Sequence, residues 1–381
     1  MKKLKICFIE LMPFPYTMGG GTTHLINLAE ALLHKDHEVF IVSSKPSRAY
    51  QKIVINNRIK TINIGIKHYK FENFNLLKLL FYIPYRIIFE LAFIISTINT
   101  LKKLKPDIIN TQSLITTSLP CSLTNKKFIA TAHGIHSLGF KRLYELNKRP
   151  LASIIGSKIY KFIESFNIKK CQRIICLGKD TYNFYKKTNK ALIIPNGVNF
   201  QKFRTYKNKR EKQIISVSRL TKQKAIDKLV LAMDNLKDYT LVIIGEGPME
   251  QHIKELIKNR KNCIFLGYQN EEKIIKYLNA SRFIVFPSEF EGLPIAMLEA
   301  MACGVIPIST KVGDVGDVIK DGYTGFFVNS NNPRDISKKI RSIEKYNLKK
   351  ISKNCVATIK ENFDWNKIAN EYIEVYNDAL L

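Results

Sequence analysis

Short runs of hydrophobic residues recur along the chain, and most are separated by a segment long enough to form a helix. Continuous runs of this kind are typical of parallel strands buried on both faces, with helices covering the sheet. Two series of about six runs lie on either side of the polar and basic stretch 199–213. The expected strands are 4–10, 39–43, 107–111, 128–132, 173–177 and 192–195, then 214–218, 239–244, 263–266, 283–287, 305–309 and 325–328. The pattern predicts two doubly wound α/β domains that bind a shared ligand in the cleft between facing strand ends.

The length and the cysteine spacing agree with this prediction. A chain of 381 residues favours two domains, because single hydrophobic cores stop growing near ~250–300 residues. The seven cysteines are scattered and form no C-x-x-C pair, which argues against a disulfide framework or a zinc site and fits a reducing compartment. The apolar run before Glu10 is too short for a signal peptide. Residues 74–98 are the most hydrophobic, but Pro84, Arg86 and Glu90 interrupt them, so we expect a core-packed or interfacial helix rather than a membrane span.

The net charge of +29 is distributed unevenly. Residues 1–208 carry 34 Lys and Arg against 10 Asp and Glu, a net +24, whereas residues 209–381 carry a net +5. Such an excess attracts a polyanion, either a nucleic acid or an anionic membrane leaflet. Segment 139–170 interleaves aromatic and basic residues, which favours a membrane surface, although a solvated helix face gives the same pattern. The composition of an AT-rich genome is a further source of lysine, but it does not explain the difference between the halves.

Residues 286–304 combine the end of a strand, a turn and a helix. Pro294 is well placed as the first helical residue, and Gly304 is a usual residue to end the helix. Glu291 then precedes the helix, and Glu299 lies about one and a half turns into it. Carboxylates at this edge of a sheet can accept hydrogen bonds from hydroxyls of a ligand whose phosphates rest on the helix amides. The alternative is that both are ordinary acids that complement the helix dipole.

Two cationic side chains follow the first strand of the second series. Arg219 lies at the strand end, and Lys224 lies five residues later, just before an expected helix at 225–236. A guanidinium and an ammonium at this position make a diphosphate clamp. We interpret Lys222 as ordinary surface charge in a lysine-rich chain. The next strand ends in another tight turn, Gly245-Glu246-Gly247-Pro248.

The first domain has its own candidates. Gly19, Gly20 and Gly21 precede an amphipathic helix and leave backbone amides open to a phosphate or a sugar. The dinucleotide fingerprint G-x-G-x-x-G and the acid after the second strand are both missing. His133 directly follows the strand at 128–132, where a side chain points into the cleft, although a structural role is the alternative. For His24 we prefer a capping or half-buried role.

Taken together, these motifs resemble those of the retaining GT-B glycosyltransferases of family 4, the glycosyl transferases group 1, over nearly the whole chain. The motifs are Gly19-Gly20, Leu28-Ala29-Glu30-Ala31-Leu32, His133, Pro195-Asn196-Gly197-Val198, Ser218-Arg219-Leu220 with Lys224, Gly245-Glu246-Gly247-Pro248, Glu291-Gly292-Leu293-Pro294, Glu299-Ala300-Met301-Ala302-Cys303-Gly304 and Asp321-Gly322-Tyr323-Thr324-Gly325. The resemblance implies two Rossmann-like domains facing across a cleft. The acceptor-binding domain is expected over residues 1–205 and the nucleotide-sugar-binding domain over 206–364, with helix 365–381 packing back on the first.

The resemblance also implies roles for single residues. Arg219 and Lys224 are expected to hold the donor diphosphate, Glu299 the ribose, and Glu291 the donor sugar. His133 is expected to contact the sugar near the reacting centre, so that Glu291 and His133 are the catalytic candidates. The remaining expected donor-binding residues are Gly19, Gly20, Gly292 and Leu293. Two positions depart from the family pattern: Ala225 stands where a glycine usually follows the lysine, and Thr22 where an acidic or polar residue is frequent.

The implied reaction moves a hexose or N-acetylhexosamine, with retention, from a nucleotide diphosphate sugar to a hydroxyl of a glycan or lipid-linked acceptor in bacterial surface polysaccharide synthesis. UDP-sugars are the expected donors, with GDP-mannose as the alternative. Since the chain has no D-x-D motif and the cationic clamp can replace a metal, no metal and no cofactor are expected. We expect a cytoplasmic protein held on the inner face of the membrane through its basic first domain. A nucleotide-sugar epimerase of the same fold is the alternative; a basic nucleic-acid-binding protein is disfavoured because no nucleic-acid motif is found.

Overall fold

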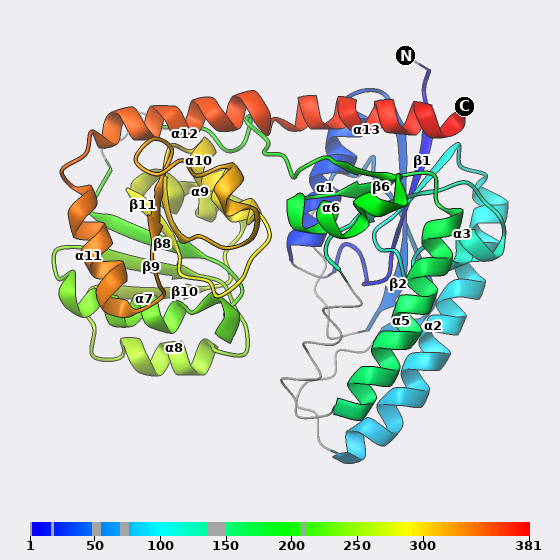
Figure 1. The fold of residues 1–381 in the computed structure, drawn as a ribbon, viewed down its shortest axis with the longest axis horizontal. Helices are drawn as coiled ribbons and strands as arrows, with labels where there is room; N and C mark the ends of the chain where they lie inside the picture. Colours follow the sequence, from blue (N-terminus) through cyan, green and yellow to red (C-terminus); the bar gives the residue numbers. More distant parts are fainter. Residues whose placement is uncertain (1, 17–18, 48–54, 69–75, 136–149, 207–209) are drawn as a thin grey trace. The chain divides into compact units, whose positions relative to one another are not determined.

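The computed structural model describes all residues except 1, 17–18, 48–54, 69–75, 136–149 and 207–209, and it leaves out the side chains of 76–84 and 150–156. The chain forms two compact units (Figure 1), unit 1 from Met1–Pro195 with Ile368–Leu381 and unit 2 from Asn196–Lys367. The sequence placed the first boundary after residue 205. The structure places it at Pro195, because Val198 and Phe203 are buried in the hydrophobic core of unit 2.

Unit 1 is built on a parallel sheet with the strand order β3-β2-β1-β4-β5-β6-β7. The strands are β1 (Lys5–Glu10), β2 (Glu38–Pro46), β3 (Lys60–His68), β4 (Ile108–Thr111), β5 (Ile129–Ala132), β6 (Ile174–Cys176) and β7 (Ala191–Ile193). The order reverses between β1 and β4, which lie side by side with Ile6 opposite Ile108. Segments that follow these two strands therefore meet at a topological switch point, where ligands bind in open α/β sheets.

The sequence did not predict β3, which is an edge strand that pairs with β2 alone. Its residues alternate between polar and apolar, and Ile64 is the one buried residue of the strand. A search for continuous hydrophobic runs finds strands that are covered on both faces and passes over a half-exposed edge strand of this kind.

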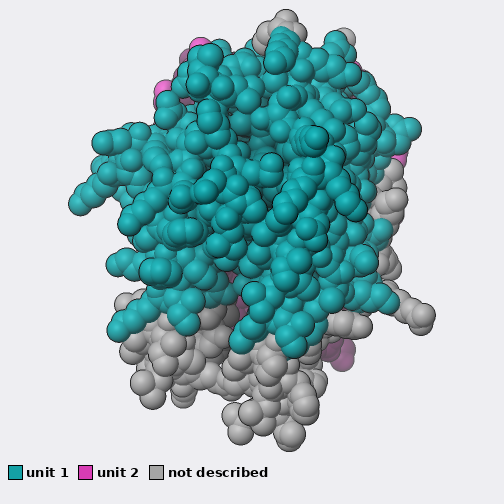
Figure 2. All heavy atoms as spheres, turned by 90° about the vertical axis from the view of Figure 1, so that its right-hand side faces the viewer, with its two compact units in different colours: residues 1–195, 368–381 teal, residues 196–367 magenta. Residues whose placement is uncertain are grey.

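The helices of unit 1 are α1 (Gly20–Leu33), α2 (Leu76–Leu104), α3 (Leu119–Leu123), α5 (Pro150–Lys170), α6 (Lys179–Tyr185) and most of α13 (Trp365–Leu380). The hydrophobic segment 74–98 thus lies largely in the single helix α2 (cyan in Figure 1). None of the helices in the described part of the chain is long and apolar enough to cross a membrane. Figure 2 shows one face of unit 1 in teal.

Unit 2 repeats this architecture with the parallel order β10-β9-β8-β11-β12-β13. Its strands are β8 (Gln213–Val217), β9 (Thr240–Ile244), β10 (Cys263–Gly267), β11 (Phe283–Phe286), β12 (Ile306–Thr310) and β13 (Phe326–Val328). Its helices are α7 (Ile226–Ala232), α8 (Glu250–Ile257), α9 (Glu271–Ala280), α10 (Ile295–Ala302), α11 (Pro333–Ile343) and α12 (Leu348–Asn362). Pro294 is the N-cap of α10 and not its first residue, and the helix ends before Gly304 as expected.

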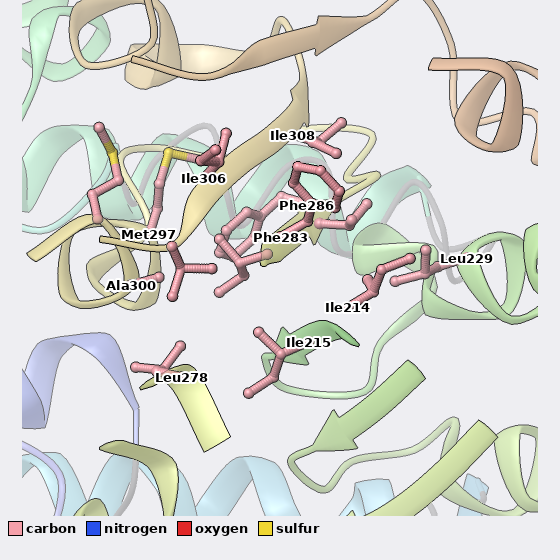
Figure 3. Packing of buried hydrophobic residues seen from close by; sticks show 14 of the residues in the cluster. Ile214, Ile215, Leu229, Leu278, Phe283, Phe286, Met297, Ala300, Ile306 and Ile308 are labelled. Atoms are coloured by element: carbon pink, nitrogen blue, oxygen red, sulfur yellow. The ribbon is translucent and has the colours of Figure 1, made fainter. Parts of the chain in front are cut away.

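The core of unit 2 explains why these segments fold together. Figure 3 shows Ile215 of β8, Phe283 of β11 and Met297 of α10 among the buried side chains between sheet and helices. Each of these three is fully buried, and burying such a side chain stabilises the fold by ~1.5–3 kcal/mol. The packing fixes where β8 and β11 end, and it therefore positions the loops that follow them.

The net charge of each half changes when the chain is divided at the structural boundary. Unit 1 carries 31 basic and 13 acidic residues, a net +18, because its α13 segment adds three acids and no base. Unit 2 carries 30 basic and 19 acidic residues, a net +11. The excess of positive charge is therefore less one-sided than a division at residue 208 indicates.

Candidate active site

The loops after β8 and β11 meet at the switch point of unit 2 and bring Lys224 and Glu291 together. The Lys224 ammonium pairs with the Glu291 carboxylate, and their side chains are only 19% and 8% exposed. Arg219, at the end of β8, is exposed to solvent. An exposed cation beside a partly buried ion pair gives this edge a positive electrostatic character suited to an anionic ligand.

Hydrogen bonds tie the two loops to one another. Gln223 Nε2 donates to the Phe290 carbonyl at 2.8 Å, and the Glu289 amide donates to the Gln223 carbonyl at 2.9 Å. Ser288 Oγ donates to Glu291 Oε1 at 3.1 Å, so one carboxylate oxygen is held by both an ammonium and a hydroxyl. Sequence reasoning missed Ser288, whose only signal was a hydroxyl three positions before Glu291.

A third loop fixes the backbone of Glu291. Gly313, after β12, has a φ of +53°, and a Cβ built on it would lie 1.8 Å from the Glu291 carbonyl oxygen. Only glycine permits this approach. The position of Glu291 is therefore set by contacts to the loops after β8 and β12 and not by its own turn alone.

This arrangement changes the predicted division of roles. The family resemblance implied separate functions for these residues, with Lys224 binding a diphosphate and Glu291 a sugar. In the structure the two side chains are partners. A diphosphate that binds Lys224 therefore has to compete with Glu291 for the ammonium or share it. Before an anion binds, the pairing with Glu291 compensates the charge of the partly buried lysine.

The Gly245-Glu246-Gly247 turn supports the segment that carries Arg219. The Leu220 amide donates to the Glu246 carbonyl at 2.9 Å. A Cβ on Gly245, whose φ is +137°, would lie 1.9 Å from the Ser218 carbonyl oxygen. The glycine at this position thus serves close backbone packing beneath Arg219.

Ala225 departs from the family pattern in a way that the structure explains. The residue has φ +50° and ψ +37°, the left-handed conformation, and forms the N-cap of α7. This conformation costs an ordinary L-residue ~1–2 kcal/mol, whereas glycine adopts it freely. The chain therefore keeps the turn after Lys224 that a glycine would make, at a cost in backbone strain.

Glu299 lies on α10 in a different electrostatic environment from Glu291. Burial raises the pKa of the Glu299 carboxyl to about 8, and the negative charge of Glu271 raises it further while Lys202 opposes the shift. Lys202 is itself paired with Glu271 at 3.2 Å. A carboxyl with this pKa is largely protonated at neutral pH, and hydroxyl donors from a ligand would favour its ionised form.

This pKa predicts how stability depends on pH. In the unfolded chain Glu299 ionises near its ordinary pKa of 4.5, whereas in the folded protein it ionises near 8, so the group removes stability as the pH rises between these values. Glu299→Gln removes this penalty. We expect the variant to unfold on the order of 5 °C above wild type at pH 8, with a much smaller difference at pH 5. The fluorescence of the single tryptophan, Trp365 of unit 2, reports the transition, and an equal difference at both pH values would contradict the shift.

The carboxyl edge of the unit 1 sheet brings the glycine segment after β1 and His133 after β5 together. Gly19 is the N-cap of α1 and Gly20 its first residue, and both are exposed. A Cβ on Gly21 would lie 3.8 Å from Nδ1 of His133, which directly follows β5. The ring of His24 is completely buried and meets the His133 ring edge-on, with centroids 5.0 Å apart. His24 is therefore more buried than predicted and lies against the candidate catalytic histidine.

The other predicted residues divide in two. Gly292 is exposed, whereas the Leu293 side chain is partly buried against the unit 2 core. The first part of segment 139–170, including residues 140–144, lies outside the described residues, and the rest forms α5. Among the described residues, no group of three or more His, Cys, Asp or Glu is placed to hold a metal ion. The seven cysteines are all buried and unpaired.

Two family models match the chain and together span most of it. The model described as glycosyl transferases group 1 matches residues 197–362, and the model described as glycosyltransferase family 4 matches residues 18–202. The chain is 28% identical to the UDP-Gal:alpha-D-GlcNAc-diphosphoundecaprenol alpha-1,3-galactosyltransferase of Escherichia coli, over 77% of this chain and 81% of that protein.

Solved structures with the same fold cover nearly the whole chain. The sucrose-phosphate synthase from Thermosynechococcus elongatus has a TM-score of 0.78 at 19% identity and covers 98% of both chains. The Anabaena protein HepE in complex with UDP and glucose has a TM-score of 0.72 at 15% identity, over 98% of this chain and 99% of that one. At these identities the likeness establishes the fold, two Rossmann-like domains of the GT-B type.

Proposed function

Since the chain belongs to the GT-B glycosyltransferases of group 1, family 4, we propose that it moves a hexose or N-acetylhexosamine from a UDP-sugar to a hydroxyl of a glycan or lipid-linked acceptor, with retention. The observation that carries the proposal is the cluster of Arg219, Lys224 and Glu291 at the strand ends of unit 2, beside the start of α10. The UDP-sugar is favoured by the UDP-Gal substrate of the Escherichia coli relative and by the UDP and glucose bound to HepE. The proposed role in surface polysaccharide synthesis is supported by the diphosphoundecaprenol acceptor of that relative.

The chemistry assigned to these residues is electrostatic. In the reaction the bond between the anomeric carbon and the diphosphate oxygen breaks, and the acceptor oxygen bonds to the same carbon from the same face. Charge develops on the departing diphosphate, which Arg219 and the Lys224 ammonium stabilise in a preorganised site. The leaving phosphate takes the acceptor proton. Glu291, freed when the diphosphate engages Lys224, and His133 hold the sugar hydroxyls near the reacting carbon, while Glu299 accepts hydrogen bonds from the ribose.

The donor is identified by thermal shift with a panel of UDP-, GDP- and ADP-sugars. A ligand that binds only the folded protein stabilises it by ~2.7 kcal/mol at a hundred times its Kd, so the true donor separates from the rest by several degrees. Transfer is then followed with that donor by product analysis, with and without acceptor and in excess chelator. An isomerised donor sugar in the absence of acceptor would show that the enzyme is an epimerase and not a transferase. Loss of activity in excess chelator would overturn the proposed metal independence.

The proposal includes an anionic membrane surface on the cytoplasmic side as a partner. Ile87, Ile88, Leu91 and Ile95 of α2 recur at helical spacing and are each more than half exposed, at 54–59%. Large aliphatic side chains on one helix face, in a unit with a net charge of +18, suit insertion at the interface of an anionic leaflet. On α5, Phe162 is 75% exposed. It follows the exposed Lys158 and Lys161 and precedes the basic helix end at Lys170.

Vesicle flotation tests this surface. The triple variant Ile88→Ser, Leu91→Ser, Ile95→Ser keeps the net charge and removes exposed apolar area, so we expect its partition to anionic vesicles to fall at least ~10-fold. The matched control is Ile264→Ser, which removes an apolar side chain of 43% exposure from β10 in unit 2 and should float as wild type does. Wild type that stays in solution at low salt would contradict the partner, and a triple variant that floats unchanged would contradict the surface.

A further inference from the structure

The imidazole of His133 is held from behind by an amide. His133 Nε2 lies 2.8 Å from Gln112 Oε1. Gln112 directly follows β4 and is 4% exposed, and its amide nitrogen donates in turn to Asn110 Oδ1 at 3.2 Å. Because the amide nitrogen of Gln112 is used toward Asn110, its oxygen faces His133, and a carbonyl oxygen can only accept a hydrogen bond.

Asn110 is held in the same direction by two further contacts. Its Oδ1 also accepts a hydrogen bond from Thr131 Oγ1 at 2.9 Å, and its Nδ2 donates to the Tyr376 hydroxyl at 2.8 Å. Asn110, Thr131 and Tyr376 are all completely buried. A buried polar chain of this kind is rigid because each broken contact leaves a desolvated group behind.

The hydrogen-bonded series that starts at His133 ends at Tyr376 of α13. A second tyrosine of the same helix is linked to His133 through His24. Tyr372 lies one helical turn before Tyr376, and its hydroxyl is 3.4 Å from Nε2 of His24. His24 packs edge-on against His133. Two buried tyrosines of the final helix therefore reach the same imidazole, one through a hydrogen-bonded chain and the other through a ring contact.

We propose that Gln112, Asn110 and Tyr376 are positioning residues that hold His133 with its proton on Nε2, so that Nδ1 is a hydrogen-bond acceptor. A sugar hydroxyl that binds at Nδ1 would then donate its hydrogen to the ring and would not accept one from it. The tautomer stands on the geometry of unit 1 alone, whereas its consequence for catalysis rests on the proposed glycosyl transfer. If the side-chain amides of Gln112 and Asn110 were both turned by about 180°, the proton of His133 would lie on Nδ1. The experiment below distinguishes this tautomer from the proposed one.

The direct test is the ¹⁵N spectrum of the histidine side chains in the full chain at pH 8, with His133→Asn used to identify the His133 signals. We expect wild type to show the Nε2–H form. Gln112→Met removes the amide and should give a mixture of both tautomers, whereas Gln112→Glu keeps an acceptor oxygen and should keep Nε2–H. The proposal is overturned if wild type shows the Nδ1–H form or if Gln112→Met leaves the tautomer unchanged. Neither result depends on knowing the sugar donor.

Two tyrosine variants test the far end of the chain. Tyr376→Phe removes the hydroxyl that holds Asn110 and should shift the His133 signals. Tyr239→Phe removes a comparable hydroxyl, which donates to Glu344 at 2.7 Å in unit 2, and should leave them unchanged. Equal effects of the two variants on the His133 signals would reduce Tyr376 to a general structural role and overturn its assignment.

Kinetics with the identified donor test the consequence. We expect Gln112→Met to lower kcat ~10–100-fold with the donor Kd within about threefold of wild type, and Gln112→Glu to restore much of the loss. A changed tautomer with unchanged kcat would overturn the catalytic consequence. If no donor is turned over by wild type, the proposed function fails while the spectrum still decides the tautomer.

Discussion

Arg219→Ala should lower kcat/KM for sugar transfer by about 10²–10³-fold while the protein stays folded. The side chain is exposed at the end of β8, so its removal leaves neither a cavity nor an unpaired buried group. Its proposed contribution is charge-assisted hydrogen bonding to the diphosphate, which is strongest when charge builds on the leaving group. Steady-state kinetics with the identified donor, together with calorimetric binding of UDP, separates the loss in binding from the loss in turnover.

Lys222→Ala is the matched control for this prediction. Lys222 is an exposed cation three positions from Arg219 in the same turn, and we assigned it to ordinary surface charge. Its loss should change kcat/KM less than twofold. Equal losses for the two variants would mean that general positive charge, and not the strand-end position of Arg219, attracts the donor. Unchanged UDP binding in Arg219→Ala would remove the clamp from the proposal.

Gly245→Ala should destabilise unit 2 by roughly 3 kcal/mol or more. The new Cβ would lie 1.9 Å from the Ser218 carbonyl oxygen, and the backbone has a φ of +137° that alanine rarely adopts. Neither partner is the flexible end of a side chain, so β8 and β9 have to separate at their carboxyl ends. Because Ser218 precedes Arg219, the same shift should weaken donor binding in protein that remains folded.

Chemical denaturation followed by Trp365 fluorescence measures this effect within unit 2. Gly316→Ala is the control, because a Cβ on Gly316 meets no atom within 4 Å and its φ is outside the left-handed region. That variant should unfold within ~0.5 kcal/mol of wild type. A small loss in Gly245→Ala would show that the loop can move, and that the glycine does not serve close packing.

Much of the fold could be predicted because buried parallel strands are local in sequence. Runs such as 283–287 and 239–244 match β11 and β9 within one residue, since strands covered on both faces are hydrophobic throughout. The edge strand β3 lacked this signal, and the boundary at Pro195 depended on which core Val198 joins. Neither could be decided from the pattern of a short window.

The candidate site divides in the same way. The positions of Arg219, Glu291 and His133 at strand ends could be predicted, because a doubly wound sheet presents the residues that follow its strands along one edge. The burial of His24 could not, because α1 contributes a ring whose neighbour is more than a hundred positions away along the chain. Gln112 is a polar residue directly after a hydrophobic run, which is weak evidence for a site residue. The sequence contains no sign that its partner is His133.

The sequence alone thus determined the two-domain fold and the residues at the strand ends, because both follow from short hydrophobic runs and from what comes directly after them. The tertiary structure alone decided which of these residues are partners. The Lys224–Glu291 pair spans 67 positions, and the chain from His133 to Tyr376 joins β4, β5 and the final helix. Contacts between segments so far apart depend on the packing of complete units, and no local spacing records them.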